Sequence, residues 1–128
     1  MVRQNFSGNS PYEPLVGFSR AVRVGNAVYV SGTVGRGENG DVVSGGVYEQ
    51  AKQAIDNIAT ALQYAGASLD EVVRTRIYLV DITKQDEVAR AHREAFGDIC
   101  PASTMVQVAA LATPEMLVEI EADAVIKP

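Results

Sequence analysis

This chain of 128 residues contains one cysteine, one histidine and no tryptophan. The lone cysteine, Cys100, cannot form a disulfide within the chain, and together with His92 it cannot supply a typical zinc site without several carboxylates. Neither residue lies in a local motif of nucleophilic catalysis. We therefore expect no internal disulfide, no metal site and no cofactor.

Long hydrophobic runs are also missing. No apolar stretch approaches the roughly 18 residues that are needed to span a bilayer. The polar start, MVRQNFSGNS, lacks the hydrophobic segment of a signal peptide. We expect a cytoplasmic protein with no membrane partner.

Positive charge is in short supply, because 11 Lys and Arg residues face 16 Asp and Glu residues, for a net charge of -5. A protein that binds nucleic acid unaided needs a basic face, so we expect no nucleic-acid partner. The glycine-rich stretch 35–46 carries neither a G-x-G-x-x-G motif after a strand nor a G-K-[ST] motif. Phosphate binding by this loop is therefore not expected.

The chain has the length and composition of one globular domain spanning residues 1–128, with 47% hydrophobic and 21% charged residues. Residues 1–15 are polar and include Pro11 and Pro14, which predicts an irregular N-terminal arm. Gly25 and Asn26 form a turn pair between two β-prone runs, which predicts a hairpin. The predicted strands are 17–24, 27–32, 72–80, 105–108 and 117–125, with an optional short strand at 42–43.

Two segments follow a helical period. Apolar residues spaced three and four apart begin at Val47 and predict a helix of about 19 residues that stops at Gly66. A second helix is predicted over about 84–96, with Thr83 as its N-cap and Gly97 at its end. Within the strand 72–80, alternation places Arg74, Arg76 and Tyr78 on one face and Val73, Thr75, Ile77 and Leu79 on the other.

The resulting order, β-β-(β)-α-β-α-β-β, predicts an α+β fold in which a mixed sheet carries both helices on one face. The opposite face of the sheet also carries alternating apolar residues. A single layer of helices leaves that face uncovered, and association with another subunit is the simplest way to cover it. We therefore expect an oligomer.

The C-terminal stretch 101–125 is predicted to form two strands joined by a short turn at 112–115. In the second strand, alternation places Glu119, Glu121 and Asp123 on one face as an acidic column. This column is either a solvated strand face or part of a site, and periodicity alone does not choose between them.

Six stretches of the sequence resemble the Rid (reactive intermediate deaminase) or YjgF superfamily. Members typically read P-A-R-S-x-V-x-V near the C-terminus, then a loop and a V/I-E-I-E-A strand. The residues that carry the resemblance are GFSRAV (17–22), VYVSG (28–32), the helix 51–69, VVRTRIYLVD (72–81), PASTMVQV (101–108) and VEIEA (118–122).

The resemblance implies a chorismate-mutase-like fold and a homotrimer with a small-molecule cleft between neighbouring subunits. The best-understood branch hydrolyses enamines and imines, such as 2-aminoacrylate and 2-iminobutanoate, to 2-oxo acids and ammonia. In that branch an arginine clamps the substrate carboxylate, a glutamate on the last strand places the attacking water, and a Ser-Gly strand end completes the pocket.

Carried over by position, the resemblance implies a catalytic Glu119 and a ligand-binding Ser31–Gly32 pair. Three other expected ligand-binding positions depart from the family pattern: Phe18 replaces a tyrosine, Met105 stands where cysteine is frequent, and Ser103 replaces the arginine. Ala89 also replaces an asparagine. Losing a buried charged clamp costs several kcal/mol, so the sequence predicts an inefficient deaminase of small 2-imino acids.

Three further residues have two interpretations each. His92 is either a core or interface histidine or an acid–base group. Arg76, like Arg74, is either part of an interface face or a substitute anion contact for the missing arginine. Cys100 has no activating neighbour in the sequence and is interpreted as structural.

Three functions follow from these observations. The first is hydrolysis of an enamine, imine or related small metabolite in an inter-subunit cleft. The second is a non-catalytic trimer that binds a metabolite or a partner protein. The third, an endoribonuclease or translation inhibitor, is disfavoured by the acidic charge and the lack of a basic or aromatic-rich run.

Overall fold

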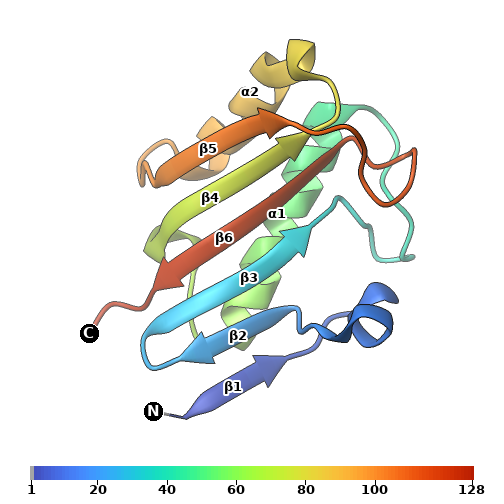
Figure 1. Cartoon of the computed structure of the whole chain (residues 1–128). Helices are drawn as coiled ribbons and strands as arrows, with labels where there is room; N and C mark the ends of the chain where they lie inside the picture. The colour runs from blue at the N-terminus through green and yellow to red at the C-terminus, as the bar shows by residue number, and fades with distance from the viewer. Residues whose placement is uncertain (1) are drawn as a thin grey trace.

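A computed structural model describes residues 2–128 of the chain. One six-stranded sheet, in the order β1-β2-β3-β6-β4-β5, carries two helices on one of its faces (Figure 1). The elements are β1 (Arg3–Phe6), β2 (Ala21–Val24), β3 (Ala27–Thr33), α1 (Val47–Tyr64), β4 (Val72–Leu79), α2 (Gln85–Phe96), β5 (Ala102–Gln107) and β6 (Val118–Val125). This confirms the predicted α+β class and the mixed sheet.

The predicted hairpin is present, since β2 and β3 pair antiparallel around Gly25 and Asn26. Gly25 has a φ of 59°, a conformation that glycine adopts without a steric cost. The optional strand at 42–43 is reduced to a single bridge between Arg36 and Val42.

The C-terminal strands do not form the local pair that the sequence predicted. β5 pairs parallel with one edge of β4, and β6 pairs antiparallel with the other edge. The chain therefore passes from β5 over β4 to β6, through residues 108–117. A parallel partner cannot be joined by a tight turn, and strand pairing between distant segments leaves no local signature in the sequence.

The N-terminal arm is more regular than predicted. Its residues Arg3–Phe6 form β1, which pairs antiparallel with β2, and Glu13–Gly17 form one π-helical turn. The side chain of Asn5 donates to the Ser19 hydroxyl at 2.9 Å. β1 is short, polar and exposed, so it is held by backbone pairing and shows no hydrophobic alternation.

The start of α2 also differs from the prediction. Thr83 does not cap α2, and Lys84 at its N-cap position makes no side-chain capping bond. The side-chain cap lies earlier, at Asp81, whose carboxylate accepts from the Thr83 backbone N–H at 3.0 Å. A 3₁₀ turn, Ile82–Lys84, then leads into α2. The N-cap was misplaced because Asp and Thr both favour such positions and lie two residues apart.

One residue of β4 lies on the wrong side of the predicted alternation. Val73 is exposed, whereas Val72 and Thr75 are buried. The register between β4 and β6 shifts between Val72 and Arg74, which marks a β-bulge there. A bulge inserts one residue into the pleat and reverses the facing of the residues before it.

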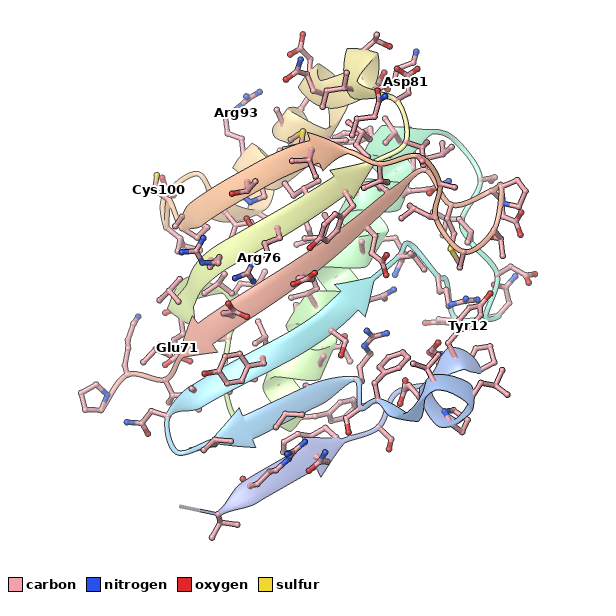
Figure 2. All side chains as sticks on the ribbon, viewed as in Figure 1. Tyr12, Glu71, Arg76, Asp81, Arg93 and Cys100 are labelled. Atoms are coloured by element: carbon pink, nitrogen blue, oxygen red, sulfur yellow. The ribbon has the colours of Figure 1, made fainter. Side chains whose placement is uncertain are left out.

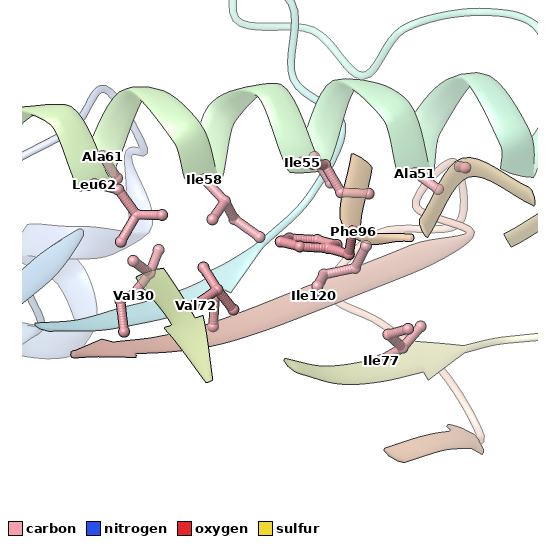
Figure 3. Close-up of a cluster of buried hydrophobic side chains, with 14 of the residues drawn as sticks. Val30, Ala51, Ile55, Ile58, Ala61, Leu62, Val72, Ile77, Phe96 and Ile120 are labelled. Atoms are coloured by element: carbon pink, nitrogen blue, oxygen red, sulfur yellow. The ribbon is translucent and has the colours of Figure 1, made fainter. Parts of the chain in front are cut away.

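The core lies between the helices and the sheet (Figure 3). α1 directs a stripe of apolar side chains onto the sheet, and Phe96 from α2 packs into the same cluster; the labelled residues are Val30, Ala51, Ile55, Ile58, Ala61, Leu62, Val72, Ile77, Phe96 and Ile120. α1 ends just before Gly66, whose φ of 86° suits a glycine past a helix terminus.

Among residues 2–128, no helix covers the second face of the sheet (Figure 1). Tyr29 and Val125, which alternate with buried strand residues, are 51% and 50% exposed, and Val106 on the edge strand β5 is 42% exposed. We call this surface the open face. Within residues 2–128 there is also no helix with both the length and the apolar character needed to cross a bilayer.

Candidate active site

A cavity of about 1050 Å³ lies where the N-terminal segment, the end of β3 and one side of α1 meet. Its wall is formed by side chains and backbone from four parts of the chain that are distant in sequence. The residues that matter for its chemistry are Phe18, Arg20, Gly32, Arg36, Asn57 and Glu119. Three of the predicted site residues, Phe18, Gly32 and Glu119, are therefore brought together here.

Glu119 reaches this cavity from β6. Its carboxylate packs directly over the backbone of Gly32, so closely that a Cβ atom at Gly32 would lie 2.6 Å from Oε2. Burial raises the pKa of the Glu119 carboxyl, while the Arg20 charge opposes the rise and Glu121 adds to it. A half-buried carboxyl with a raised pKa is suited to exchanging a proton with water.

Arg20 is the cation that faces this carboxyl. Its Nη2 donates to the Gly32 carbonyl oxygen at 2.5 Å, and its guanidinium lies 5.7 Å from the centre of the Phe18 ring. Burial lowers the pKa of Arg20, and the neighbouring carboxylates of Glu13 and Glu119 counteract this. An arginine remains protonated in proteins, so it brings a positive charge into the cavity wall.

The wall around these residues is fixed by hydrogen bonds from buried or half-buried side chains. The carboxylate of Glu13 accepts from the Gly8 backbone N–H at 3.0 Å, which closes the N-terminal loop. The amide of Asn57, on α1, donates to the carbonyls of Val34 at 3.2 Å and Arg36 at 2.9 Å. These contacts hold the segment after β3 against the helix.

Arg36 and Tyr12 close the outer side of the cavity. The Arg36 guanidinium lies over the Tyr12 ring, 5.8 Å from its centre, and donates to the Gly40 carbonyl at 2.8 Å. Tyr12 projects from the helical turn of the N-terminal segment (Figure 2). The cavity wall thus contains two guanidinium groups and the Glu119 carboxyl.

Ser31 lies next to this cavity and supports its wall. Its hydroxyl donates to the Ser19 carbonyl at 2.7 Å, and its backbone N–H donates to the Arg20 carbonyl at 3.0 Å. Ser31 therefore fixes the segment that carries Phe18 and Arg20 against β3.

Ser103 and Met105 lie elsewhere, on β5. They pair in register with Thr75 and Ile77, whose side chains are buried under the helices. Neighbours in a parallel pair face the same side of a sheet. Ser103 and Met105 therefore face the helix side, with Ser103 exposed at the sheet edge and Met105 packed against the core. Neither lines the cavity around Glu119.

Ser103 ends a short hydrogen-bonded chain that starts at His92. The hydroxyl of Thr75, fully buried, lies 2.9 Å from Nε2 of His92 and donates to the Ser103 hydroxyl at 2.8 Å. His92 also packs against Phe96, with ring centres 4.7 Å apart. Burial lowers the pKa of the imidazole. These contacts describe a half-buried histidine between the helix and the sheet.

Arg76 lies on the open face, over β4 (Figure 2). Its Nη1 is 3.3 Å from Asp123 Oδ2 and 3.5 Å from Glu121 Oε1. Tyr78 donates to the other oxygen of Glu121 at 2.5 Å. Two members of the acidic column are therefore paired with Arg76, and only Glu119 turns into the cavity. With two carboxylates already beside it, Arg76 is not a free anion contact.

Sequence reasoning missed Arg20, Arg36 and Asn57. Arg20 lies within the quoted GFSRAV stretch, but strand alternation gives no sign that its side chain reaches a carboxyl on the last strand. Arg36 and Asn57 lie in a glycine-rich connection and on a helix flank, where polar residues are ordinary. Within residues 2–128, no group of three or more His, Cys, Asp or Glu side chains is placed to hold a metal ion.

Comparison with known proteins gives a consistent result. The family described as Endoribonuclease L-PSP matches residues 8–126. A RutC family protein of Pyrococcus abyssi is 37% identical over 118 residues, which cover 91% of each chain. The 2-iminobutanoate/2-iminopropanoate deaminase of Homo sapiens is 39% identical over 112 residues, covering 87% of this chain and 81% of the human protein.

Solved structures agree with the sequence relatives. The crystal structure of a Mycobacterium tuberculosis member of the YjgF/YER057c/UK114 family has a TM-score of 0.89 and 46% sequence identity to this chain. That match covers 98% of this chain and 100% of the mycobacterial one. The fold and the sequence thus point to the same group of proteins.

Proposed function

Because this chain belongs to the Endoribonuclease L-PSP family, also known as the YjgF or Rid family, we propose that it hydrolyses an enamine or imine of a small metabolite. The observation that carries the proposal is Glu119: a carboxyl with a raised pKa, in a cavity wall, in contact with Gly32 and facing a cation. An enamine enters the same reaction after it tautomerises to the imine.

Glu119 would act on water. Its carboxylate accepts a proton from a water molecule as the water oxygen bonds to the imine carbon, and the electrons of the C=N bond move to nitrogen. Glu119 passes this proton to the nitrogen, which completes the neutral carbinolamine. In the second half, Glu119 accepts the proton of the carbinolamine hydroxyl as the C=O bond forms, and it gives this proton to the nitrogen as the C–N bond breaks and ammonia leaves. The sum is one imine and one water giving one carbonyl compound and one ammonia.

Burial and the Arg20 charge act in opposite directions on the pKa of the Glu119 carboxyl. Burial favours the protonated carboxyl and the Arg20 charge favours the carboxylate. A group held between these two influences can accept and return a proton in one cycle more readily than an exposed glutamate can.

The proposal includes assembly as a homotrimer with the cleft between subunits. It is supported by the open face, where Tyr29, Val106 and Val125 are exposed beside charged residues. It is also supported by the separation of the predicted site residues. Glu119 and Ser103 lie on different strands and face opposite sides of the sheet. Only a second copy can bring Ser103 to the Glu119 cavity.

The serine at position 103 argues for a substrate other than 2-iminobutanoate or 2-aminoacrylate, which we expect to turn over slowly. The second candidate is a non-catalytic trimer that binds a metabolite, favoured by the same loss of the position-103 arginine. Ribonuclease activity, despite the description of the matched family, is opposed by the net charge of -5.

Turnover of a panel of imino acids, generated in situ from amino acids by an L-amino-acid oxidase, tests the proposal. Glu121→Gln is the matched control, since Glu121 is two residues along the same strand and faces the same side but does not line the cavity. We expect Glu119→Gln to lose at least about a hundredfold in kcat/KM, a typical cost of removing an acid–base group, and Glu121→Gln to retain activity. Equal turnover by the native protein and Glu119→Gln, or no turnover of any imine, would contradict the proposal.

A further inference from the structure

Thr75 is the most deeply buried polar side chain among residues 2–128. It lies on β4 beneath the helices and is 0% exposed, on the same side of the strand as the core residues Ile77 and Leu79. Valine has the same shape and buries no polar atom, so a hydroxyl at this position is costly unless it is hydrogen-bonded. Its partners are His92 Nε2 at 2.9 Å and Ser103 Oγ at 2.8 Å. We call these three residues the polar network.

The hydrogen bonds of the polar network run in one direction. A hydroxyl carries a single hydrogen, and Thr75 donates its own to Ser103. Thr75 must therefore accept from His92, which places a hydrogen on Nε2. Nδ1 is then the unprotonated ring nitrogen, and no acceptor among residues 2–128 lies within hydrogen-bond distance of it.

The free end of the polar network is the Ser103 hydroxyl. β5 forms one edge of the sheet, and Ser103 is exposed there (Figure 1). Its oxygen accepts from Thr75, and its own hydrogen has no acceptor in the described part of the chain. The bond from Thr75 occupies one lone pair of this oxygen and orients the hydroxyl. Ser103 therefore presents a hydrogen-bond donor to a group that binds at this edge.

The polar network carries no charge at neutral pH. Burial lowers the pKa of His92, and no charged group contributes to the shift, so the imidazole is neutral near pH 7. Arg76, the residue after Thr75 on β4, lies on the open face beside Glu121 and Asp123. A hydroxyl donor with no cation beside it suits an uncharged acceptor better than a carboxylate, which needs a charged partner when it leaves water.

We propose that His92 and Thr75 are positioning residues that hold Ser103 as a neutral hydrogen-bond donor, which selects a substrate with an uncharged carbonyl oxygen beside the reacting carbon. This rests on the proposed function, in which a second copy brings Ser103 to the Glu119 cavity. It names the substrate class: an imine or enamine that carries an amide, ester or ketone group. Ser103 holds the carbonyl oxygen of this group while the imine carbon faces Glu119.

NMR of the imidazole tests the direction of the polar network. His92 is the one histidine of the chain, so its ring nitrogens give a single set of signals. We expect the native protein to hold the Nε2–H tautomer. Thr75→Val removes the hydroxyl at nearly constant shape and should give a mixture of tautomers, whereas Thr75→Ser should keep the native form. A native imidazole with its hydrogen on Nδ1 would overturn the inference.

Binding of stable ligands tests the selection without requiring turnover. The ligands are uncharged 2-oxobutanamide and 2-oxobutanoate, which has the same carbon skeleton and a carboxylate, measured by calorimetry and by ligand-observed NMR. The variants are Ser103→Ala, Thr75→Val and Thr75→Ser. The control, Thr104→Ala, removes a hydroxyl from the next residue of the same strand, which pairs with Arg76. Thermal melts establish that each variant folds.

We expect native protein and Thr104→Ala to bind the amide alike, and more tightly than they bind the carboxylate. Ser103→Ala should bind the amide about threefold to tenfold more weakly, as loss of one neutral hydrogen bond predicts, and should bind the carboxylate unchanged. Thr75→Val should lose part of this factor, and Thr75→Ser should restore it. A purely structural role for the network would instead weaken both ligands together.

Four binding results would overturn the inference. They are full amide affinity in Ser103→Ala or in Thr75→Val, an equal loss for both ligands, carboxylate binding to the native protein as tight as amide binding, and no amide binding to the native protein.

The outcomes separate this inference from the proposed hydrolysis. If the native protein binds the amide through Ser103 but hydrolyses no imine, the donor site stands and the hydrolase proposal fails. If turnover that depends on Glu119 is found while Ser103→Ala changes neither the KM of any substrate nor the amide affinity, the hydrolase stands and the donor site fails.

Discussion

Gly32 lies so close to Glu119 that no larger residue fits without moving the carboxylate. A Cβ atom at position 32 would lie 2.6 Å from Oε2, 2.9 Å from Cδ and 3.3 Å from Cγ of Glu119. All three contacts are with the side chain, so the glycine provides room for the carboxylate, and the backbone at this position needs no special φ. The Ser-Gly end of β3 thus sets the position of the group on which the proposed chemistry depends.

Gly32→Ala should therefore displace the Glu119 carboxylate. We expect kcat/KM to fall at least about tenfold, because small displacements of a catalytic group cost this much or more, and the free energy of unfolding to fall by about 1–2 kcal/mol from overpacking. Steady-state turnover and urea unfolding measure the two effects. Gly46→Ala is the control and should keep its activity, because a Cβ atom at position 46 would lie 3.5 Å from Glu49 Oε2, an ordinary van der Waals distance. Full activity in Gly32→Ala would show that Glu119 need not occupy its observed position.

Removing the Glu119 charge should stabilise the folded protein at neutral pH. The pKa of Glu119 is raised in the folded state, which means that the folded protein favours the protonated carboxyl. The stabilisation that this provides is present below the unfolded pKa of about 4.3 and is lost as the pH rises through the pKa of the folded state. Glu119→Gln should melt about 1–4 °C higher than the native protein near pH 7.5. The difference should shrink as the pH is lowered toward 4. A lower Tm for Glu119→Gln near pH 7.5 would show that its carboxylate stabilises the fold.

His92 should make the folded state sensitive to acid. Burial lowers the pKa of His92 in the folded protein below the value of about 6.5 that it has in the unfolded chain. Between these two pKa values the unfolded chain binds more protons than the folded protein, so the free energy of unfolding rises with pH. This contribution is complete above about pH 6.5 and is lost as pH falls through the folded pKa. His92→Gln keeps a polar partner for Thr75 but cannot be protonated. Its free energy of unfolding should depend less on pH in this window, and an identical dependence would place His92 in solvent.

Assembly should depend on the open face. Light scattering at micromolar concentration should give three times the chain mass of 13.6 kDa. Val106→Glu places a charge on an exposed apolar position of β5 and should reduce the mass to that of one chain, because a buried unpaired carboxylate is costly. Ala110→Glu, in the exposed loop after β5, is the control. A monomeric native protein would remove the inter-subunit cleft from the account.

The parts of the fold that were predictable are those with local periodicity. α1 was identified because the residues that it buries, including Ala51, Ile58 and Leu62, recur every three or four positions. The pairing of β5 and β6 with opposite edges of β4 was not, because it depends on which distant strands meet. β1 was missed for a related reason, since its polar side chains carry no pattern and its stability comes from backbone bonds to β2.

Some residues of the candidate site could also be predicted from the sequence, and others could not. Phe18, Gly32 and Glu119 were named through family resemblance, and the structure brings them together in one cavity. Arg20 could not be found by pattern, because its place in the cavity wall near Glu119 depends on how distant segments pack. Arg76 was an attractive substitute anion contact in the sequence, but Glu121 and Asp123 lie two strand positions apart on β6 and both reach it.

The most direct test is the rate of 2-oxobutanoate release from 2-iminobutanoate by Ser103→Arg and by the double variant Ser103→Arg/Glu119→Gln. The central claim is that a second subunit brings position 103 to the Glu119 cavity, which one chain alone cannot do. The account predicts that Ser103→Arg raises kcat/KM roughly tenfold or more over the native protein, as a new charged contact with the carboxylate would, and that the double variant loses this gain. No gain in Ser103→Arg, or a gain that persists without the Glu119 carboxylate, would contradict it.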